Sequence, residues 1–373
     1  MKTLLRIIRN ETFSAYILLP IGLLAILLGA HVDSHFLVQT HQIGNWHFNL
    51  RELTLDYLIG FFFYNIGLQL RFELAEGALQ NRRILVVSSI AALLGMFVPA
   101  VTFFLFNRVN GTSTTGWGIT MATDLPLVLA LLVALKKSHL KGFVLALATI
   151  DDIGSIIVLS ILYKAHLNLA YILALLALLA LLVIYFLISY LSASKALLFI
   201  TFIAGLAVGH QTGIQTSLVA VLFGILTFNN RKKGMDLNEN LLALVEPITA
   251  FFVVPVFVFV SLFRRFDFST ASLGSRLVLS LIIVRLVGKP FGIFLGILLG
   301  RALLKVKLGF TTGESLFIGA LGTLGLSVSL IFAQSDFTGA QQDLAILGIL
   351  LTIPAGVLLA TMVRLLSRPA KTL

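Results

Sequence analysis

Ala148-Thr149-Ile150-Asp151-Asp152-Ile153-Gly154 places two adjacent carboxylates in the middle of an apolar segment that runs from about residue 142 to residue 162. A second apolar segment holds Thr123-Asp124, and a third holds Lys289. An ionised side chain at the centre of a membrane helix costs about 2.5–3.5 kcal/mol on insertion scales. Because four such charges are expensive when unpaired, we expect them to act together in one wet cavity, for ion or proton movement.

Long apolar runs dominate the 373-residue chain, which is 58% hydrophobic and 12% charged. In a soluble domain about a quarter of the residues are charged. No charged residue interrupts residues 171–190, and only Arg285 and Lys289 interrupt residues 277–299. Runs of this length span a bilayer, and short alternating barrel strands are missing. We therefore predict an all-α polytopic membrane protein, without an extramembrane domain large enough to be an enzyme. There is no cysteine, which excludes disulfides and thiolate metal sites.

Twelve apolar segments stand out, and we predict about twelve transmembrane helices. The segments lie at about residues 12–30, 54–70, 84–106, 116–135, 142–163, 168–191, 196–210, 213–228, 242–263, 273–300, 314–333 and 343–366. The first segment lacks a small-residue cleavage site and is predicted to be a retained helix rather than a signal peptide.

The basic residues indicate the orientation of these segments. Of the 27 lysines and arginines, 19 fall in loops on one side, 6 on the other, and 2 inside a span. The positive-inside rule then places both termini in the cytoplasm. The net charge of +11 reflects this topology, so we expect membrane lipid and no nucleic acid as a partner.

The longest outer loop, residues 31–53, is polar and carries four of the seven histidines, His31, His35, His41 and His47. Its alternating character predicts a small hairpin over the outer face. A metal site there is an alternative, but a solvated loop is the simpler interpretation.

Two of the apolar segments contain a predicted break. Asp124 is followed by Leu125-Pro126, and proline disfavours helix at the residue before it. Gly319, Gly322 and Gly325 lie at a spacing of three, with Ser327 after them. Paired interrupted spans are typical of inverted-repeat transporters. A simple proline kink and close helix packing through small residues are the structural alternatives.

The two adjacent aspartates are expected to have different roles. Neighbours on a helix point about 100° apart, so both cannot face one cavity. One is expected to face the ion path while the other pairs with a cation on a neighbouring helix. Lys289, which precedes Pro290, needs a counter-charge, and the intramembrane aspartates supply it. Two carboxylates used only in helix packing are the structural alternative.

Taken together, these motifs resemble the NhaA family of sodium/proton antiporters, from about Glu52 to Arg364. The resemblance rests on Thr123-Asp124, on Ala-x-Ile-Asp-Asp-x-Gly at 148–154 and on Gly-Lys-Pro-x-Gly at 288–292. It implies that Thr123, Asp124 and Asp152 hold the cation, Na+ or Li+, or the proton. It also implies that Asp151 is the ion-pair partner of Lys289.

The resemblance implies one transmembrane transporter domain over residues 1–373. Its inverted repeats would cover about residues 84–163 and 273–366, each with one broken, crossing helix. The implied function is electrogenic exchange of cytoplasmic Na+ or Li+ for external H+ by alternating access, for pH and sodium homeostasis. The location would be the plasma or inner membrane of a bacterium, with no cofactor and with a homodimer formed through the loop 31–53.

Three departures from the family pattern bear on regulation. Gln69 and Phe72 replace an acidic and a basic residue, and Arg285 is an additional charge. One alternative is a sodium-coupled symporter that holds an organic anion with Arg285 or Lys289. A non-transporting sensor or scaffold is the other. Dissipation of a pH gradient by Na+ or Li+ alone separates the antiporter from the symporter.

Overall fold

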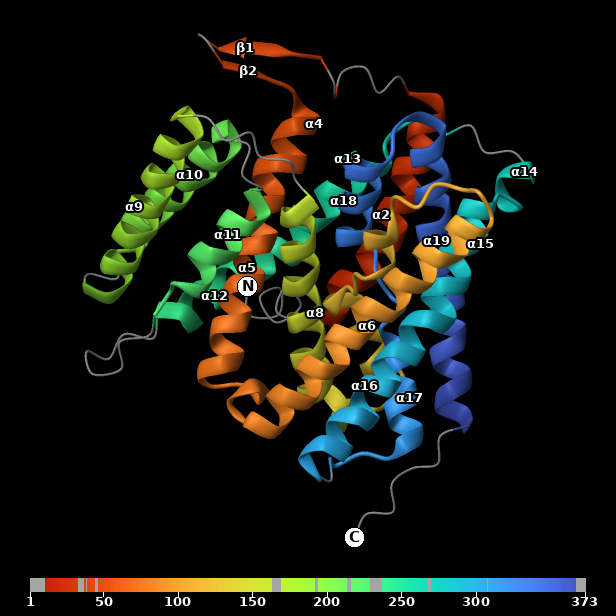
Figure 1. Cartoon of the computed structure of the whole chain (residues 1–373). Coiled ribbons are helices and arrows are strands. Elements are labelled where there is room, and N and C mark those ends of the chain that lie inside the picture. Colours follow the sequence, from red (N-terminus) through yellow and green to blue (C-terminus); the bar gives the residue numbers. More distant parts are fainter. Residues whose placement is uncertain are drawn as a thin grey trace. The chain divides into compact units, whose positions relative to one another are not determined.

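Figure 1 shows the computed structural model of the chain, in which helices form nearly all of the regular structure. It describes residues 11–32, 37, 39–43, 46–162, 169–191, 194–212, 216–228, 237–266, 270–306 and 308–366. The predicted cytoplasmic termini at residues 1–10 and 367–373 lie outside the described residues.

The twelve predicted apolar segments all coincide with helices. Eight helices are long and apolar enough to cross a membrane within the described part of the chain, and three shorter apolar helices accompany them. The segment predicted at 314–333 corresponds to two short helices in succession. A multi-span helical membrane protein is thereby confirmed, whereas twelve as the number of spans stays a prediction.

The chain divides into two compact units, each made of two separate stretches of sequence. Residues 1–76 and 156–265 form the first unit, and residues 77–155 and 266–373 form the second. The prediction of one transporter domain over the whole chain stays a prediction.

The first unit contains the outer loop and six of the predicted segments. Its described elements are α2 (Glu11–His31), β1 (His41–Ile43), β2 (Trp46–Phe48), α4 (Leu50–Glu52), η1 (Leu53–Leu58), α5 (Ile59–Ala75), α9 (Leu169–Leu191), α10 (Lys195–Thr212), α11 (Thr216–Ile225), α12 (Leu237–Ile248), η6 (Thr249–Val253) and α13 (Val254–Leu262). Strand β1 pairs antiparallel with β2, with His41 opposite Phe48. The hairpin predicted in the loop 31–53 is confirmed, and its two strands stand beside the helices of this unit.

Two glycines bring α5 and α11 into backbone contact within the first unit. A Cβ on Gly67 would lie 2.4 Å from the carbonyl oxygen of Val221, and one on Gly224 would lie 2.4 Å from that of Tyr64. Beside this contact, the buried hydroxyl of Tyr185 lies 2.7 Å from that of Tyr64 and 2.8 Å from that of Thr227. These polar groups satisfy one another, as burial requires.

The second unit contains all of the predicted site residues. Its described elements are η2 (Ala78–Gln80), α6 (Arg82–Val109), η3 (Trp117–Thr120), α7 (Leu125–Ala134), η4 (Ser138–Leu140), α8 (Lys141–Leu162, which belongs to this unit as far as Ser155), α14 (Thr270–Leu273), α15 (Arg276–Ile283), η7 (Val284–Gly288), α16 (Lys289–Leu304), α17 (Thr312–Leu321), α18 (Ser327–Asp336) and α19 (Gly339–Leu366). Figure 1 shows α6, in orange, running beside α16, in blue.

Small residues allow α6 and α16 to pack backbone against backbone. A Cβ on Gly292 would lie 2.4 Å from the carbonyl oxygen of Leu94, and one on Gly296 would lie 2.5 Å from the Cα of Ala91. Side chains do not fit between helices at this distance. Helix α16 is thereby fixed against α6, and the buried Lys289 at its start is fixed with it.

Candidate functional site

The first break lies between η3, which ends at Thr120, and α7, which begins at Leu125. Asp124 has an extended backbone with φ −92° and ψ 111°, and Pro126 lies in the first turn of α7. Proline fits there because the first helical amides have no partner within the helix. The break predicted from Pro126 is confirmed.

The second break lies between α17, which ends at Leu321, and α18, which begins at Ser327. It falls in the glycine-rich stretch that the sequence predicts to be weak. The backbone amide of Asp124 donates a hydrogen bond of 2.7 Å to the carbonyl of Leu324. The two breaks therefore lie side by side, although 200 residues separate them in the sequence.

Charged side chains bind the backbone groups that these breaks release. Oδ2 of Asp124 accepts hydrogen bonds from the amides of Leu326 at 2.7 Å and Ser327 at 2.8 Å, and from the hydroxyl of Ser327 at 3.2 Å. An anion is thus held at the N-terminus of α18, where the helix dipole favours it. Lys289 donates to the carbonyl of Met121, at the C-terminal end of η3, and Arg285 donates to the carbonyl of Gly325, within the second break, at 2.6 Å.

Asp151 forms a buried ion pair with Lys289. Nζ of Lys289 lies 2.9 Å from Oδ2 of Asp151, and the two side chains are 0% and 3% exposed. The hydroxyl of Thr123 lies 2.6 Å from the same oxygen and 3.1 Å from the carbonyl oxygen of Gly322. A hydroxyl has one proton, so Thr123 donates to one of these oxygens at a time and keeps its lone pairs.

Asp152 lies next to this pair without sharing in it. Its side chain is buried, and within the described residues its Oδ1 has no hydrogen-bond partner. Oδ1 of Asp151 is unpartnered in the same way. The charges of Asp124 and Asp151 both act on Asp152. A buried, unpaired carboxylate is unfavourable unless it binds a proton or a cation, which is the chemistry that ion exchange requires.

The predicted ligands Thr123, Asp124 and Asp152 have different contacts in this arrangement. Thr123 is directed to Asp151, and one oxygen of Asp124 is bound by α18. The described chain contains no group of three acidic or histidine side chains that could hold a metal ion. A single monovalent cation would have to use fewer carboxylates, together with hydroxyl and carbonyl oxygens.

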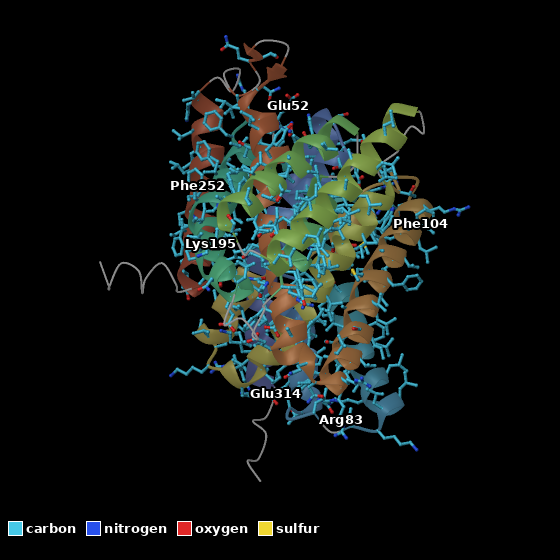
Figure 2. The ribbon with its side chains drawn as sticks, turned by 90° about the vertical axis from the view of Figure 1, so that its left-hand side faces the viewer. Glu52, Arg83, Phe104, Lys195, Phe252 and Glu314 are labelled. Atoms are coloured by element: carbon cyan, nitrogen blue, oxygen red, sulfur yellow. The ribbon has the colours of Figure 1, made fainter. Side chains whose placement is uncertain are left out.

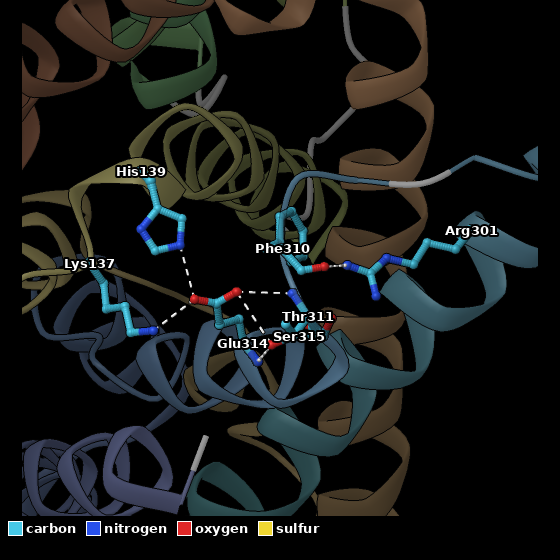
Figure 3. Close-up of polar contacts among 7 residues, drawn as sticks. All are labelled: Lys137, His139, Arg301, Phe310, Thr311, Glu314 and Ser315. Atoms are coloured by element: carbon cyan, nitrogen blue, oxygen red, sulfur yellow. Dashed lines mark hydrogen bonds and ion pairs between the residues drawn. The ribbon is translucent and has the colours of Figure 1, made fainter. Parts of the chain in front are cut away.

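A second polar cluster lies at the start of α17 (Figure 3). The carboxylate of Glu314 accepts a hydrogen bond from Nζ of Lys137 at 2.7 Å and lies 2.9 Å from Nε2 of His139. It also accepts from the amide of Thr311 at 2.9 Å, which completes a capping box. Beside it, Arg301 donates to the carbonyl of Phe310 at 2.7 Å.

Opposing effects set the pKa of Glu314. Burial raises this pKa, but the hydrogen bonds from Lys137, Thr311 and His139 outweigh burial and hold the pKa below its ordinary value. The cluster joins the segment between α7 and α8 to α17, so the two broken helices are linked at a place other than their breaks. Figure 2 shows Glu314 at the same end of the second unit as Arg83, one of the residues that the charge pattern places at the cytoplasmic face.

Sequence reasoning singled out the charged residues but missed their backbone partners. The amides of Leu326 and Ser327 and the carbonyl of Met121 have no signature in the sequence. The cluster around Glu314 was also missed, although Thr311-x-x-Glu314 is the spacing of a capping box and could have located it.

Comparisons with known proteins show the family of the chain. The sequence model of the family described as Na+/H+ antiporter 1 matches residues 5–364. The Na(+)/H(+) antiporter NhaA of Vibrio vulnificus strain YJ016 is 31% identical over 299 residues, which cover 77% of this chain and 75% of that protein. The Na(+)/H(+) antiporter NhaA 1 of Saccharopolyspora erythraea is 30% identical, covering 98% of this chain and 91% of that protein.

A solved structure shows a similar fold. The sodium proton antiporter MjNhaP1 of Methanocaldococcus jannaschii matches with a TM-score of 0.57 over 98% of this chain and 99% of that chain, at 16% sequence identity. At this identity the likeness concerns the fold alone.

A multi-span helical protein with two adjacent helix breaks and buried carboxylates at them is an ion-coupled secondary transporter. More narrowly, the match over nearly the whole chain shows that it belongs to the Na+/H+ antiporter 1 family, and it is a divergent NhaA relative. The symporter alternative has no support among these relatives.

Proposed function

We propose that this sodium/proton antiporter exchanges its ions at Asp152, which holds H+ in one half of the cycle and Na+ or Li+ in the other. The observation that supports this most directly is the buried Oδ1 of Asp152, which lacks a hydrogen-bond partner in the described part of the chain. A carboxylate binds a proton or a cation at the same oxygens, so the two ions exclude each other. This exclusion couples the two fluxes.

Asp124 and Thr123 complete the cation site in this proposal. Hard oxygen ligands suit hard cations such as Na+ and Li+. The hydroxyl of Thr123 can donate to Asp151 and still offer a lone pair to the cation. Asp124 contributes charge from the N-terminus of α18, which holds it in place. The pair Asp151–Lys289 fixes α8 against α16 next to Asp152.

The transport cycle is proposed to follow the family. Cytoplasmic Na+ or Li+ leaves and external H+ enters by alternating access, electrogenically, to maintain pH and sodium balance. Net charge moves only if more than one proton enters per cation, so a second carboxylate of the site besides Asp152 would also take up a proton. The inverted repeats at 84–163 and 273–366 would each supply one long helix, one broken helix and another long helix. The first of these residue ranges covers α6, η3–α7 and α8, and the second covers α15–α16, α17–α18 and α19.

The proposed setting is the plasma or inner membrane of a bacterium, with both termini in the cytoplasm. The excess of basic residues on one side supports this orientation. A homodimer through the loop 31–53 is proposed from the family resemblance, and the two-stranded hairpin of β1 and β2 in that loop would offer strand edges for pairing.

Purified protein in proteoliposomes tests this function. A pH-sensitive dye would report the collapse of an imposed pH gradient when Na+, Li+ and K+ are added in turn, without organic solute. We expect collapse with Na+ or Li+ and none with K+. Faster exchange when a K+ ionophore removes the membrane potential would show electrogenicity. A response that requires an organic anion would contradict the proposal.

A further inference from the structure

Arg285 is a buried cation that no step of the proposed exchange uses. Its side chain is 0% exposed and lies in the π-helical turn η7, one turn before Lys289. Such turns inside helices are frequent at functional sites. Nη2 donates to the carbonyl of Gly325, while Nε and Nη1 have no partner within the described residues. Because an unpaired buried charge is unfavourable, its presence calls for an explanation.

The position of Arg285 relates it to the ion site. Gly325, which it contacts, directly precedes the two amides that hold Asp124. The guanidinium and the carboxylate therefore bind the two ends of one peptide unit, the carbonyl of Gly325 and the amide of Leu326. The charges of Arg285 and Asp124 act on each other, and Arg285 also acts on Lys289. A cation bound at Asp152 and Asp124 would lie in the field of Arg285.

A count of charges gives the consequence. The described cluster contains three carboxylates, Asp124, Asp151 and Asp152, and two cations, Lys289 and Arg285. With all five groups ionised the site carries one net negative charge, which a single monovalent ion neutralises. Without Arg285 the site would carry two net negative charges. Two unit charges about 10 Å apart interact by about 1.7 kcal/mol at an effective dielectric constant of 20, which is more than tenfold in affinity.

We propose that Arg285 is a resident counter-cation that weakens the binding of the transported cation, so that the site holds one ion loosely enough to release it. This inference rests on the proposed function of Asp152 and Asp124 as the cation site. It assigns Arg285 a role in setting affinity, and it separates that role from the hydrogen bond to Gly325.

Four single variants distinguish charge from hydrogen bonding. Arg285→Gln removes the charge and retains a donor for the carbonyl of Gly325, whereas Arg285→Met removes both. Arg285→Lys retains the charge. Arg276→Gln is the matched control, because Arg276 lies in the same span and donates to the carbonyl of Asn110 at 2.6 Å. The readouts are the KM for Na+ in proteoliposomes and the Na+ concentration that gives half of the maximal rise in melting temperature. Both are measured at one alkaline pH, so that proton competition is small.

The charge role predicts a lower KM for Na+ in both neutral variants, by about tenfold, with no increase in kcat. Arg285→Lys and the control should stay near the wild-type KM. Unchanged or weaker Na+ binding in the neutral variants would overturn the proposal. A change confined to Arg285→Met would also overturn it, because the hydrogen bond would then be the active contact.

The effect of removing the charge of Arg285 is also measured in a second background, Asp124→Asn. This keeps the proposal testable if Arg285→Met alone fails to fold. In Asp124→Asn protein, adding Arg285→Met leaves no unbalanced cation, and it should tighten Na+ binding relative to Asp124→Asn alone. Equal Na+ affinities of Asp124→Asn and of the double variant Asp124→Asn with Arg285→Met would contradict the charge role. Wild-type protein that shows no response to Na+ in either assay would instead refute the proposed function, so the two failures are distinguishable.

Discussion

Lys289 is held by two kinds of oxygen, the carboxylate of Asp151 and the backbone carbonyl of Met121. Lys289→Ala leaves the carboxylate buried without its counter-charge. Breaking one side of a buried pair typically costs roughly 3–5 kcal/mol. We therefore expect a marked fall in melting temperature in detergent, with less protein in the folded, monodisperse fraction. A melting temperature within error of the wild type would show that the pair contributes little.

The double variant Asp151→Asn with Lys289→Gln should recover a large part of this loss, since neither charge is left alone. We expect only part of the stability to return, because glutamine is shorter than lysine and does not replace the hydrogen bond to the carbonyl of Met121. Melting curves of Asp151→Asn, of Lys289→Gln and of the double variant form the cycle that measures the coupling between the two side chains. Additive losses would mean that Lys289 is balanced by Asp152 or Asp124 rather than by Asp151.

Helix α16 depends on close contact with α6. A Cβ on Gly296 would lie 2.5 Å from the Cα of Ala91, which is backbone and cannot rotate away. Gly296→Ala should therefore separate the helices and destabilise the protein by about 1–3 kcal/mol, the usual cost of overpacking. Gly309→Ala is the control, because nothing lies within 4 Å of a Cβ there. Equal melting temperatures for the two variants would argue against this close contact.

The ion pair of Glu314 should make stability depend on pH. The pKa of this carboxylate is held below its ordinary value, so the pair stabilises the fold above the unfolded glutamate value of about 4.3. The stabilisation is lost as the pH falls through the folded pKa. Glu314→Gln should lower the melting temperature by a few degrees at neutral pH. This difference should shrink on acidification, while the exposed control Glu52→Gln should show little difference at any pH. A difference for Glu314→Gln that stays constant with pH would contradict the ion pair.

Helix positions and breaks followed from local rules, and this is why the sequence was enough to predict them. Pro126 lacks an amide proton and therefore fits the first turn of a helix, which favours a helix start there, although Pro99 and Pro354 lie inside helices. The partners of Asp124 and Lys289 depend on segments about 200 and 170 residues away. No local sequence pattern indicates that the amides of Leu326 and Ser327 bind Asp124, because every residue type except proline has a backbone amide proton.

At the scale of the whole protein, ion competition should govern the pH dependence of transport. The family resemblance implies that Gln69 and Phe72 of α5 replace titratable groups. Protons and Na+ then compete for the same carboxylates, so a higher Na+ concentration should move the acid limb of the activity curve to lower pH. One proton displaced per cation gives a shift of about one unit for a tenfold change in Na+. Exchange rates across a pH series at several Na+ concentrations measure it. An acid limb that stays fixed at saturating Na+ would indicate a dedicated sensor, with Glu73 and Glu76 as candidates.

The central claim is that Asp152 exchanges the ions. The most direct test compares Asp152→Asn with Ser155→Ala in proteoliposomes, since Ser155 lies one turn further along α8 and its buried hydroxyl also lacks a partner within the described residues. Asparagine can neither exchange a proton nor supply charge to a cation. We predict that Asp152→Asn abolishes Na+-driven proton movement while the protein stays folded, and that Ser155→Ala retains it. Normal exchange by purified, folded Asp152→Asn protein would contradict the account.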